Sequence, residues 1–395
     1  MTPLTPLIMV LNCGSSSIKF ALFDASHSPI PRKPIWNGKI DGITGKSPLF
    51  SETGAAPTTL SLDLKQPYHA ALEHIRDRVM SRLNGQHIIG IAHRVVHGSN
   101  HYSAPILINA TILDDLRSMI PLAPLHQPFA LEAIGALLTL YPELPQVACF
   151  DTAFHHTLPV VEQMLPLPWE NWLQGMRRYG FHGLSYDYMS VVLNERYGEQ
   201  ALARTIVAHI GSGASLCAMQ NLKSVATTMG FSALDGLMMG TRCGSLDPGA
   251  VLYLMETQKL SVEQVGHMLY HQSGLLGISG ISDDTQVLLE QEVNNPRAHA
   301  ALALYVRRIV REIGALTAVL GGLDMLVFTA GVGEHNAEIR KRVCAALGYL
   351  DLHINATANT ENAAVISTKT SRVTVAVEPT NEEWIAAVHT AQLIQ

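Results

Sequence analysis

Two segments that lie about 200 residues apart repeat one pattern, in which an apolar run, a turn of glycine and serine, and a second apolar run follow each other. The first copy spans residues 7–23 around the turn at 14–17, and the second spans 205–219 around the turn at 211–215. Short apolar runs on both sides of a tight turn predict paired strands. Because an internal repeat of such a unit indicates duplication, we expect two related domains that face each other across a cleft.

The rest of the chain predicts an α/β fold. Its 395 residues exceed what one hydrophobic core normally supports, and short apolar runs alternate with segments of helical spacing. The apolar face of the helix predicted at 297–320 should include Leu304, Ile309 and Ile313, whereas residues 47–59 should form a polar loop. Further strands are expected at residues 88–96, 146–150, 325–329 and 373–377, and further helices at 68–83, 112–119, 129–140 and 382–394.

Charge and cysteine content exclude several classes of protein. A formal net charge of −6 argues against a generally basic surface for nucleic acid. The five cysteines form no CxxC and have no His or Cys at metal-ligand spacing, which favours reduced thiols in a reducing compartment. No apolar run reaches the roughly 18 residues that a membrane-spanning helix needs. We therefore expect a cytoplasmic protein without nucleic-acid or membrane partners.

Three glycine-rich turns, at residues 14–17, 211–215 and 331–334, each follow an apolar run. Such turns expose several backbone N–H groups and form concave anion sites. Neither the GxxxxGK[ST] loop nor the GxGxxG spacing occurs. Any one of them could be an ordinary hairpin turn, but three of one type favour phosphate binding. Lys19 could reach a phosphate from the first turn, or face solvent on an edge strand.

Two arginines lie in apolar surroundings, Arg94 in the run 93–97 and Arg242 in the run 239–244. A buried guanidinium must be paired, because uncompensated burial of a charge is expensive. Either an Asp or Glu partner or an anionic ligand would satisfy it. Among the 18 histidines, His126, His182 and His209 stand beside glycine or proline, or before a turn. For any single histidine a structural role is the simpler interpretation.

These segments resemble, in order, the motifs of the acetate kinase family, which shares the fold of sugar kinases, Hsp70 and actin. The similarity runs from residue 8 to residue 388. It is carried by NCGSSSIK at 12–19, HRVVHG at 93–98, PLAPLH at 121–126, FDTAFH at 150–155, RYGFHG at 178–183, GTR at 240–242, FTAGVGE at 328–334 and PTNEE at 379–383.

The resemblance implies two duplicated ribonuclease-H-like domains with a central cleft. Residues 1–152, completed by the C-terminal helix 382–395, would form the first domain, and residues 153–381 the nucleotide-binding domain. The implied activity is reversible, Mg²⁺-dependent, in-line transfer of the ATP γ-phosphoryl group to acetate, by a homodimer. A propionate or mixed short-chain acyl kinase is the alternative, because Ala233 replaces a proline of the acyl pocket and could enlarge it. An ATP-hinged chaperone or cytoskeletal protein would leave Arg94 and Arg242 unexplained.

The resemblance also assigns roles to residues. The metal, Mg²⁺ or Mn²⁺, would be held by Asn12 and Glu382. Arg94 and Arg242 would bracket the acyl carboxylate and the phosphoryl group, His182 would stabilise the transition state, and Asp151 is the assigned catalytic carboxylate. The acyl pocket would be lined by Val96, Leu125, Phe181 and Ala233. ATP and ADP would be contacted by Lys19, His209, Gly211, Ser212, Gly213, Asp284, Thr285, Gln286, Gly331, Val332, Gly333, Glu334 and His335.

The chemistry gives these roles a physical reason. An acetate oxygen is already anionic at neutral pH, so no general base is needed, and the difficulty is to bring two anions together. Charge neutralisation and positioning should therefore dominate catalysis, and an orienting role suits Asp151 better than proton transfer. The chain departs from the family at several positions near the nucleotide and the acyl group. They are Ser212 and His335 in place of Asn, Gln286 in place of Arg, Tyr186 in place of a second His, and Leu184 in place of Thr.

Overall fold

The computed structural model describes residues 4–63 and 65–394. Its contacts divide the chain into two compact units, the first formed by Met1–Phe154 with Asn381–Gln395 and the second by His155–Thr380. Among the described residues, no helix is both long and apolar enough to cross a membrane.

The first unit is built on an eight-stranded sheet with the strand order β5-β4-β3-β2-β1-β6-β8-β7. The first three strands form an antiparallel meander, and two more strands run parallel to β1 on its other side. The strands are β1 (Thr5–Cys13), β2 (Ser17–Asp24), β3 (Trp36–Asp41), β4 (Leu49–Glu52), β5 (Thr58–Thr59), β6 (Gln86–Val95), β7 (Ile106–Leu107) and β8 (Gln146–Phe150).

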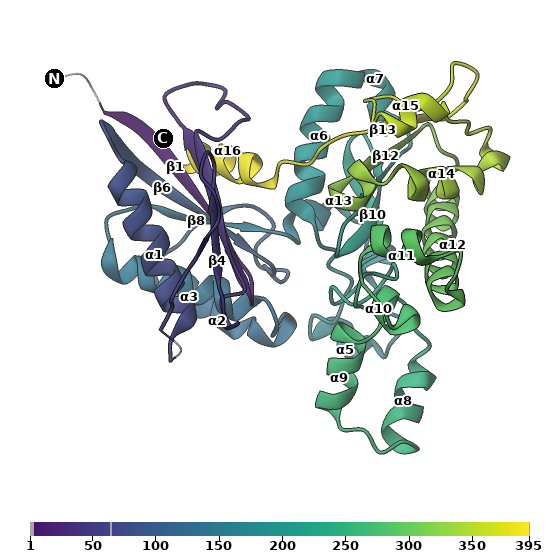
Figure 1. Cartoon of the computed structure of the whole chain (residues 1–395), viewed down its shortest axis with the longest axis horizontal. Coiled ribbons are helices and arrows are strands. Elements are labelled where there is room, and N and C mark those ends of the chain that lie inside the picture. Colours follow the sequence, from purple (N-terminus) through teal and green to yellow (C-terminus); the bar gives the residue numbers. More distant parts are fainter. Residues whose placement is uncertain (1–3, 64, 395) are drawn as a thin grey trace. The chain divides into compact units, whose positions relative to one another are not determined.

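Helices cover both faces of this sheet (Figure 1). Leu7, Met9 and Leu11 of β1 belong to a core cluster that also contains buried side chains of α1 (Pro67–Arg82). On the opposite face, α16 (Glu382–Ile394) packs against β6. Gly90 makes this approach possible, because a Cβ there would lie 2.8 Å from Cδ1 of Ile394. The remaining helices of the unit are α2 (Ala110–Ser118) and α3 (Gln127–Leu140), with a 3-10 turn at Ile120–Leu122.

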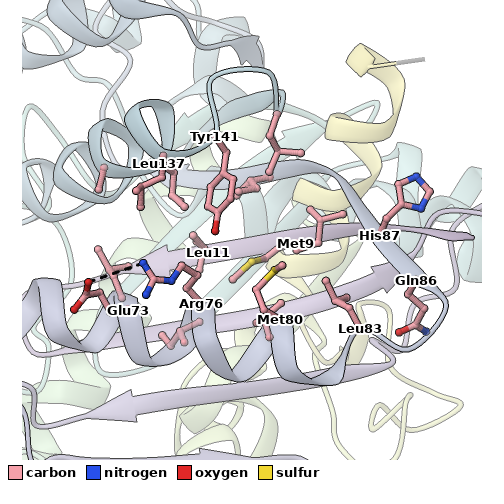
Figure 2. A pocket seen from close by; sticks show the side chains of 18 of the residues that line it. Met9, Leu11, Glu73, Arg76, Met80, Leu83, Gln86, His87, Leu137 and Tyr141 are labelled. Carbon is pink, nitrogen blue, oxygen red and sulfur yellow. Dashed lines mark ion pairs between the residues drawn. The ribbon is translucent and has the colours of Figure 1, made fainter.

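A cavity of about 530 Å³ lies between α1 and α3, over β1 and β6 (Figure 2). Its lining is mainly aliphatic, with Met9 and Leu11 on the sheet and Met80 and Leu137 on the helices. It belongs to the first unit alone.

The second unit repeats the first in its strand order. Its five-stranded sheet has the order β11-β10-β9-β12-β13, in which three strands form an antiparallel meander and two run parallel to β9. This matches β3-β2-β1-β6-β8 strand for strand, so the predicted duplication is confirmed. The strands are β9 (Thr205–Ile210), β10 (Ala214–Gln220), β11 (Lys223–Thr227), β12 (Met325–Thr329) and β13 (Thr374–Val377).

The longest helix of the second unit is α12 (Pro296–Leu320). The side chain of Asn295 accepts hydrogen bonds from the first-turn N–H groups, and Gly321 ends the helix with a φ of 70°. The other helices are α4 (Val160–Gln163), α5 (Trp169–Leu173), α6 (Gly183–Tyr197), α7 (Glu199–Leu202), α8 (Pro248–Glu256), α9 (Val262–His271), α10 (Gly274–Ser279), α11 (Thr285–Gln291), α13 (Ala330–His335), α14 (Ala337–Ala345) and α15 (Ala356–Thr360), with 3-10 turns at Ala153–Thr157 and Gly348–Leu350.

Three predictions of local structure are wrong. The loop predicted at 47–59 contains β4 and β5, because Phe50 points inward and packs against Phe20 while its neighbours are polar or exposed. The turn predicted at 331–334 is helix α13. Leu304 is 37% exposed, so it does not belong to the buried face of α12, although Ile309 and Ile313 do.

Candidate active site

The first unit gathers Arg94, Asp151 and Glu382 at one edge of its sheet. Arg94 is near the end of β6 and Asp151 follows β8, the adjacent parallel strand. The carboxyl ends of parallel strands meet at one edge of a sheet, which is where ligands of α/β proteins commonly bind. Glu382 joins them as the first residue of α16. The chain thus brings together three predicted site residues that are far apart in sequence.

Arg94 is paired, as its apolar surroundings require. Its Nε lies 3.0 Å from each carboxylate oxygen of Asp151, and its Nη2 lies 2.7 Å from Oδ2. Its Nη1 lies 3.8 Å from Oε2 of Glu382. Burial alone would lower the pKa of the guanidinium, but the Asp151 and Glu382 carboxylates raise it above its ordinary value. Arg94 therefore stays a cation. Of the two partners expected for it, an acidic side chain or an anionic ligand, the structure contains the acidic side chains Asp151 and Glu382.

Glu382 is the titratable member of this cluster. Its pKa is raised to about 7; burial is the largest cause, the Asp151 and Glu383 carboxylates add to the rise, and Arg94 and Lys19 oppose it. Asn12 lies on β1, one residue before the strand ends, and therefore just before the turn at 14–17. Among the described residues, no group of three or more His, Cys, Asp or Glu side chains is placed to hold a metal ion. Asn12 and Glu382 could therefore supply only part of a coordination shell.

Lys19 lies beside the first glycine-rich turn. It pairs with Asn12 across the β1–β2 hairpin, whose turn is closed by a bond of 2.8 Å from Gly14 N to Ser17 O. The edge-strand alternative is wrong, because β2 is hydrogen-bonded to β1 and to β3. The Lys19 side chain is exposed and lines a cavity of about 500 Å³ that also includes Lys39 and Glu383.

In the second unit, His182 is held by its backbone and by its ring. It is the N-cap of α6 with a φ of 59°, a left-handed conformation that is strained for a residue with a side chain. Its ring stacks on that of His209, with centroids 4.1 Å apart and planes 16° apart. Its Nδ1 lies 2.9 Å from Oγ of Ser215, which in turn lies 2.5 Å from the hydroxyl of Tyr186.

Gly213 marks where His182, Arg242 and the second glycine-rich turn come together. A Cβ at Gly213 would lie 3.3 Å from His182 Nε2 and 3.7 Å from Arg242 Nη1. The turn is closed by Gly211 N, which donates to Gly213 O at 3.1 Å. Arg242 Nη1 also donates to the carbonyl of Ala233 at 3.0 Å. A cation, an imidazole and a glycine turn thus adjoin one another, as an anion site requires.

A cavity of about 520 Å³ in the second unit collects most of the predicted nucleotide contacts. Five predicted residues do not line it, and they are Lys19, which belongs to the first unit, and His209, Gly213, Gly333 and Glu334. Glu334 instead accepts hydrogen bonds from the backbone N–H groups of Ala330 and Thr380, so it shapes the start of α13. The lining residues are Gly211, Ser212, Gly240, Leu275, Asp283, Asp284, Thr285, Gln286, Tyr305, Gly331, Val332, His335 and Asn336.

The four residues predicted for the acyl pocket are divided between the units. Val96 follows β6, and Leu125, which is 38% exposed, precedes α3. Phe181 is buried beside His182, and Ala233 lies beside Arg242. Sequence reasoning assigned no individual role to Ser215 or Ser185. For Ser185 the signal is its spacing on α6, because Ser185 and Tyr186 come three and four residues after His182, on the same helix face. Ser215 lies on β10 and gives no such signal.

Comparison with known proteins extends this picture over the whole chain. A family model described as the Acetokinase family matches residues 7–388. The acetate kinase of Rhodopseudomonas palustris is 45% identical, with 99% of each chain covered. The crystal structure of Porphyromonas gingivalis acetate kinase matches with a TM-score of 0.89 and 34% identity, covering 99% of this chain and 100% of the other. A propionate kinase from Francisella tularensis matches with a TM-score of 0.90 and 36% identity, covering 98% and 99%.

Proposed function

The chain belongs to the acetokinase family, and from this premise we propose that it transfers the γ-phosphoryl group of ATP reversibly to acetate, giving acetyl phosphate and ADP. The observation that carries the proposal is the approach of His182 Nε2 and Arg242 Nη1 to Gly213 in the second glycine-rich turn. Together they provide two N–H donors of the kind that an anionic phosphoryl group needs.

The proposed mechanism is direct in-line transfer. The acetate oxygen attacks the γ-phosphorus, the bond to the bridging oxygen of ADP breaks, and no proton has to move. Catalysis then consists of neutralising charge and holding the reactants in line. Arg94 and Arg242 bracket the acetate carboxylate and the transferring phosphoryl group, and His182 donates from Nε2. Asp151 orients Arg94 through the paired hydrogen bonds between them.

The donor atoms of the first unit fit a magnesium ion. Asn12 offers an amide oxygen and Glu382 a carboxylate, and hard oxygen ligands of this kind suit Mg²⁺ or Mn²⁺. Mg²⁺ is commonly held by one or two protein carboxylates while phosphates and water complete its shell, which agrees with the small donor set. When bound, the ion would neutralise charge on the ATP phosphates.

The nucleotide is proposed to occupy the cavity of about 520 Å³ in the second unit. Asp284, Thr285 and Gln286 from the start of α11 and Gly331, Val332 and His335 from α13 would contact it, with Gly211 and Ser212 on the phosphate side. Five further residues do not line the cavity and are proposed to contact the phosphates or to support the residues that do. They are Lys19, His209, Gly213, Gly333 and Glu334. Pockets of 300–1,000 Å³ are typical for ligands of this size.

Acetate is favoured over propionate as the acceptor. The relatives that are 45% and 42% identical over nearly the whole chain are acetate kinases. The acyl group would be bounded by Val96, Leu125, Phe181 and Ala233. We assign the small side chain of Ala233 a secondary effect, some tolerance for an additional methylene.

A homodimer in the cytoplasm is part of the proposal. The apolar helix α8 has no buried residue, and Leu252 and Tyr253 on it are each 56% exposed. Figure 1 shows α8 beside α9 at one end of the second unit. A second copy of the chain would cover these side chains. The five cysteines, all among the described residues, form no disulfide, which suits a reducing compartment.

Trapping of the product tests the function. The purified chain, incubated with ATP, Mg²⁺, acetate and hydroxylamine, should give acetyl hydroxamate, which is detected by its ferric complex. The same mixture without acetate is the control. Absence of hydroxamate at every enzyme concentration, with ADP also absent, would show that the chain is not an acetate kinase.

A further inference from the structure

Two rungs of hydrogen bonds tie α6 to the strands that carry the second glycine-rich turn. Ser185 Oγ lies 2.8 Å from His209 Nδ1 on β9, and Tyr186 Oη lies 2.5 Å from Ser215 Oγ on β10. Ser215 and His209 face each other across the β9–β10 pair. Ser185, Tyr186 and Ser215 are fully buried. Both hydrogen bonds start from residues one helical turn after His182. They therefore hold the first turn of α6, and with it the His182 imidazole, as one rigid group with β9 and β10.

His182 can adopt only one ring orientation within this group. The stacked His209 ring covers one face of its imidazole, and Ser215 occupies hydrogen-bonding distance of Nδ1. Nε2 is then the nitrogen that borders Gly213 and lies on the same side as Arg242 Nη1. The hydrogen bond at Nδ1 therefore decides whether Nε2 presents a proton or a lone pair to that space.

We propose that Tyr186 and Ser215 are positioning residues that fix His182 as the tautomer with its proton on Nε2. In this relay the Tyr186 hydroxyl donates to Ser215 Oγ, and the Ser215 hydroxyl donates to His182 Nδ1. The inference rests on the proposed function, in which His182 Nε2 faces an anionic phosphoryl group. If His182 Nδ1 instead donated to Ser215, the imidazole proton would be on Nδ1. The lone pair of Nε2 would then point toward the anion and repel it.

Burial supports the donor role of the tyrosine. The pKa of Tyr186 is raised well above 10 because the phenol is removed from water, so the hydroxyl keeps its proton throughout the working pH range. Ser215 has a single hydrogen, and accepting from Tyr186 leaves that hydrogen for His182.

The test separates the state of the ring from turnover. The ¹⁵N chemical shifts of the His182 ring, assigned with a His182→Gln variant, should show the proton on Nε2 in the wild-type chain. Ser215→Ala and Tyr186→Phe should each give a mixture of tautomers and lower kcat at least about tenfold, with KM for ATP and acetate nearly unchanged. Ser215→Thr should keep both the tautomer and the rate.

Tyr197→Phe is the matched control, because Tyr197 lies on the same helix and bonds to Glu378 rather than to the relay. It should leave the His182 shifts and kcat unchanged. A wild-type ring protonated on Nδ1, or an unaltered tautomer in both Ser215→Ala and Tyr186→Phe, would overturn the inference. The ¹⁵N shifts can be measured without turnover. A chain without kinase activity would therefore refute the proposed function, while the shifts would still decide the tautomer of His182.

Discussion

The guanidinium group of Arg94 donates to both carboxylate oxygens of Asp151, with Nε 3.0 Å from each and Nη2 2.7 Å from Oδ2. This arrangement assigns Asp151 an orienting role. Asp151→Asn should lower kcat by about 10- to 100-fold, because it weakens the fork without removing the cation. The shape of the kcat–pH profile should not change. Loss of an acidic limb in the variant would instead identify Asp151 as a proton acceptor.

The size of the residue at position 233 should set acyl selectivity. Ala233→Pro fills space beside Arg242 and retains the backbone carbonyl that accepts from it. We expect kcat/KM for propionate to fall by about tenfold more than that for acetate, because one methylene is worth about 1–3 kcal/mol in a closed pocket. Steady-state kinetics with both acids measure this, and Ala233→Gly should shift the ratio the other way. An unchanged ratio in both variants would place the acyl group elsewhere.

His93 should make the stability of the first unit depend on pH. It is fully buried with Nε2 2.8 Å from Gln146 Oε1, and burial lowers its pKa from 6.5 to about 4. Below pH 6.5 the unfolded chain binds a proton that the folded chain does not, so stability falls as the pH falls toward 4. Between pH 7.5 and 5 this costs up to about 2 kcal/mol.

Urea unfolding at both pH values checks that cost. His93→Gln should reduce the loss of unfolding free energy on acidification, whereas His87→Gln, an exposed histidine of the same strand, should not. An equal pH dependence in wild type and His93→Gln would contradict the expected protonation difference.

The exposed apolar side chains of α8 should mediate association. Leu252→Glu places a charge at a position that a second copy would bury, so it should convert the dimer to a monomer at micromolar concentration. Light scattering coupled to size exclusion gives the mass directly. Glu256→Gln, on the same helix, serves as the control and should remain dimeric. A monomeric wild-type chain, or a Leu252→Glu dimer, would refute this surface.

Strong local patterns made much of the fold predictable. β12 and α16 begin and end where the sequence predicts. The short apolar run of β12 is bounded by Asp324 and by glycine, and the apolar residues of α16 follow the spacing of a helix. β4 and β5 were not predictable, since both are short, β5 is at the edge of the sheet, and their one inward aromatic, Phe50, lies between the exposed Leu49 and the polar Ser51. The glycines of the segment at 331–334 predict a turn, yet it is a helix: Glu334 accepts a hydrogen bond from the N–H of Ala330, and Arg340 donates to the carbonyl of Gly333.

The charged residues of the candidate site were predictable from the sequence. The residues that hydrogen-bond to its histidines and hold them in place were not. Arg94 and Arg242 stand out because a guanidinium in an apolar run needs a partner. Ser215 and Tyr186 give no such signal, since serine and tyrosine are common in buried hydrogen bonds, and only the folded α6 brings them to His182. The convergence of residues from α11 and α13 on one cavity, where nucleotide contacts are proposed, likewise depends on tertiary packing.

Charge neutralisation by arginine is the central claim, and kcat of Arg242→Ala in the hydroxamate assay tests it most directly. With the fold verified by circular dichroism, and with the exposed Arg307→Ala as the matched control, the variant should lose at least about 100-fold in kcat while the control keeps the wild-type value. A variant of Arg242 that retained near-normal kcat would contradict the account.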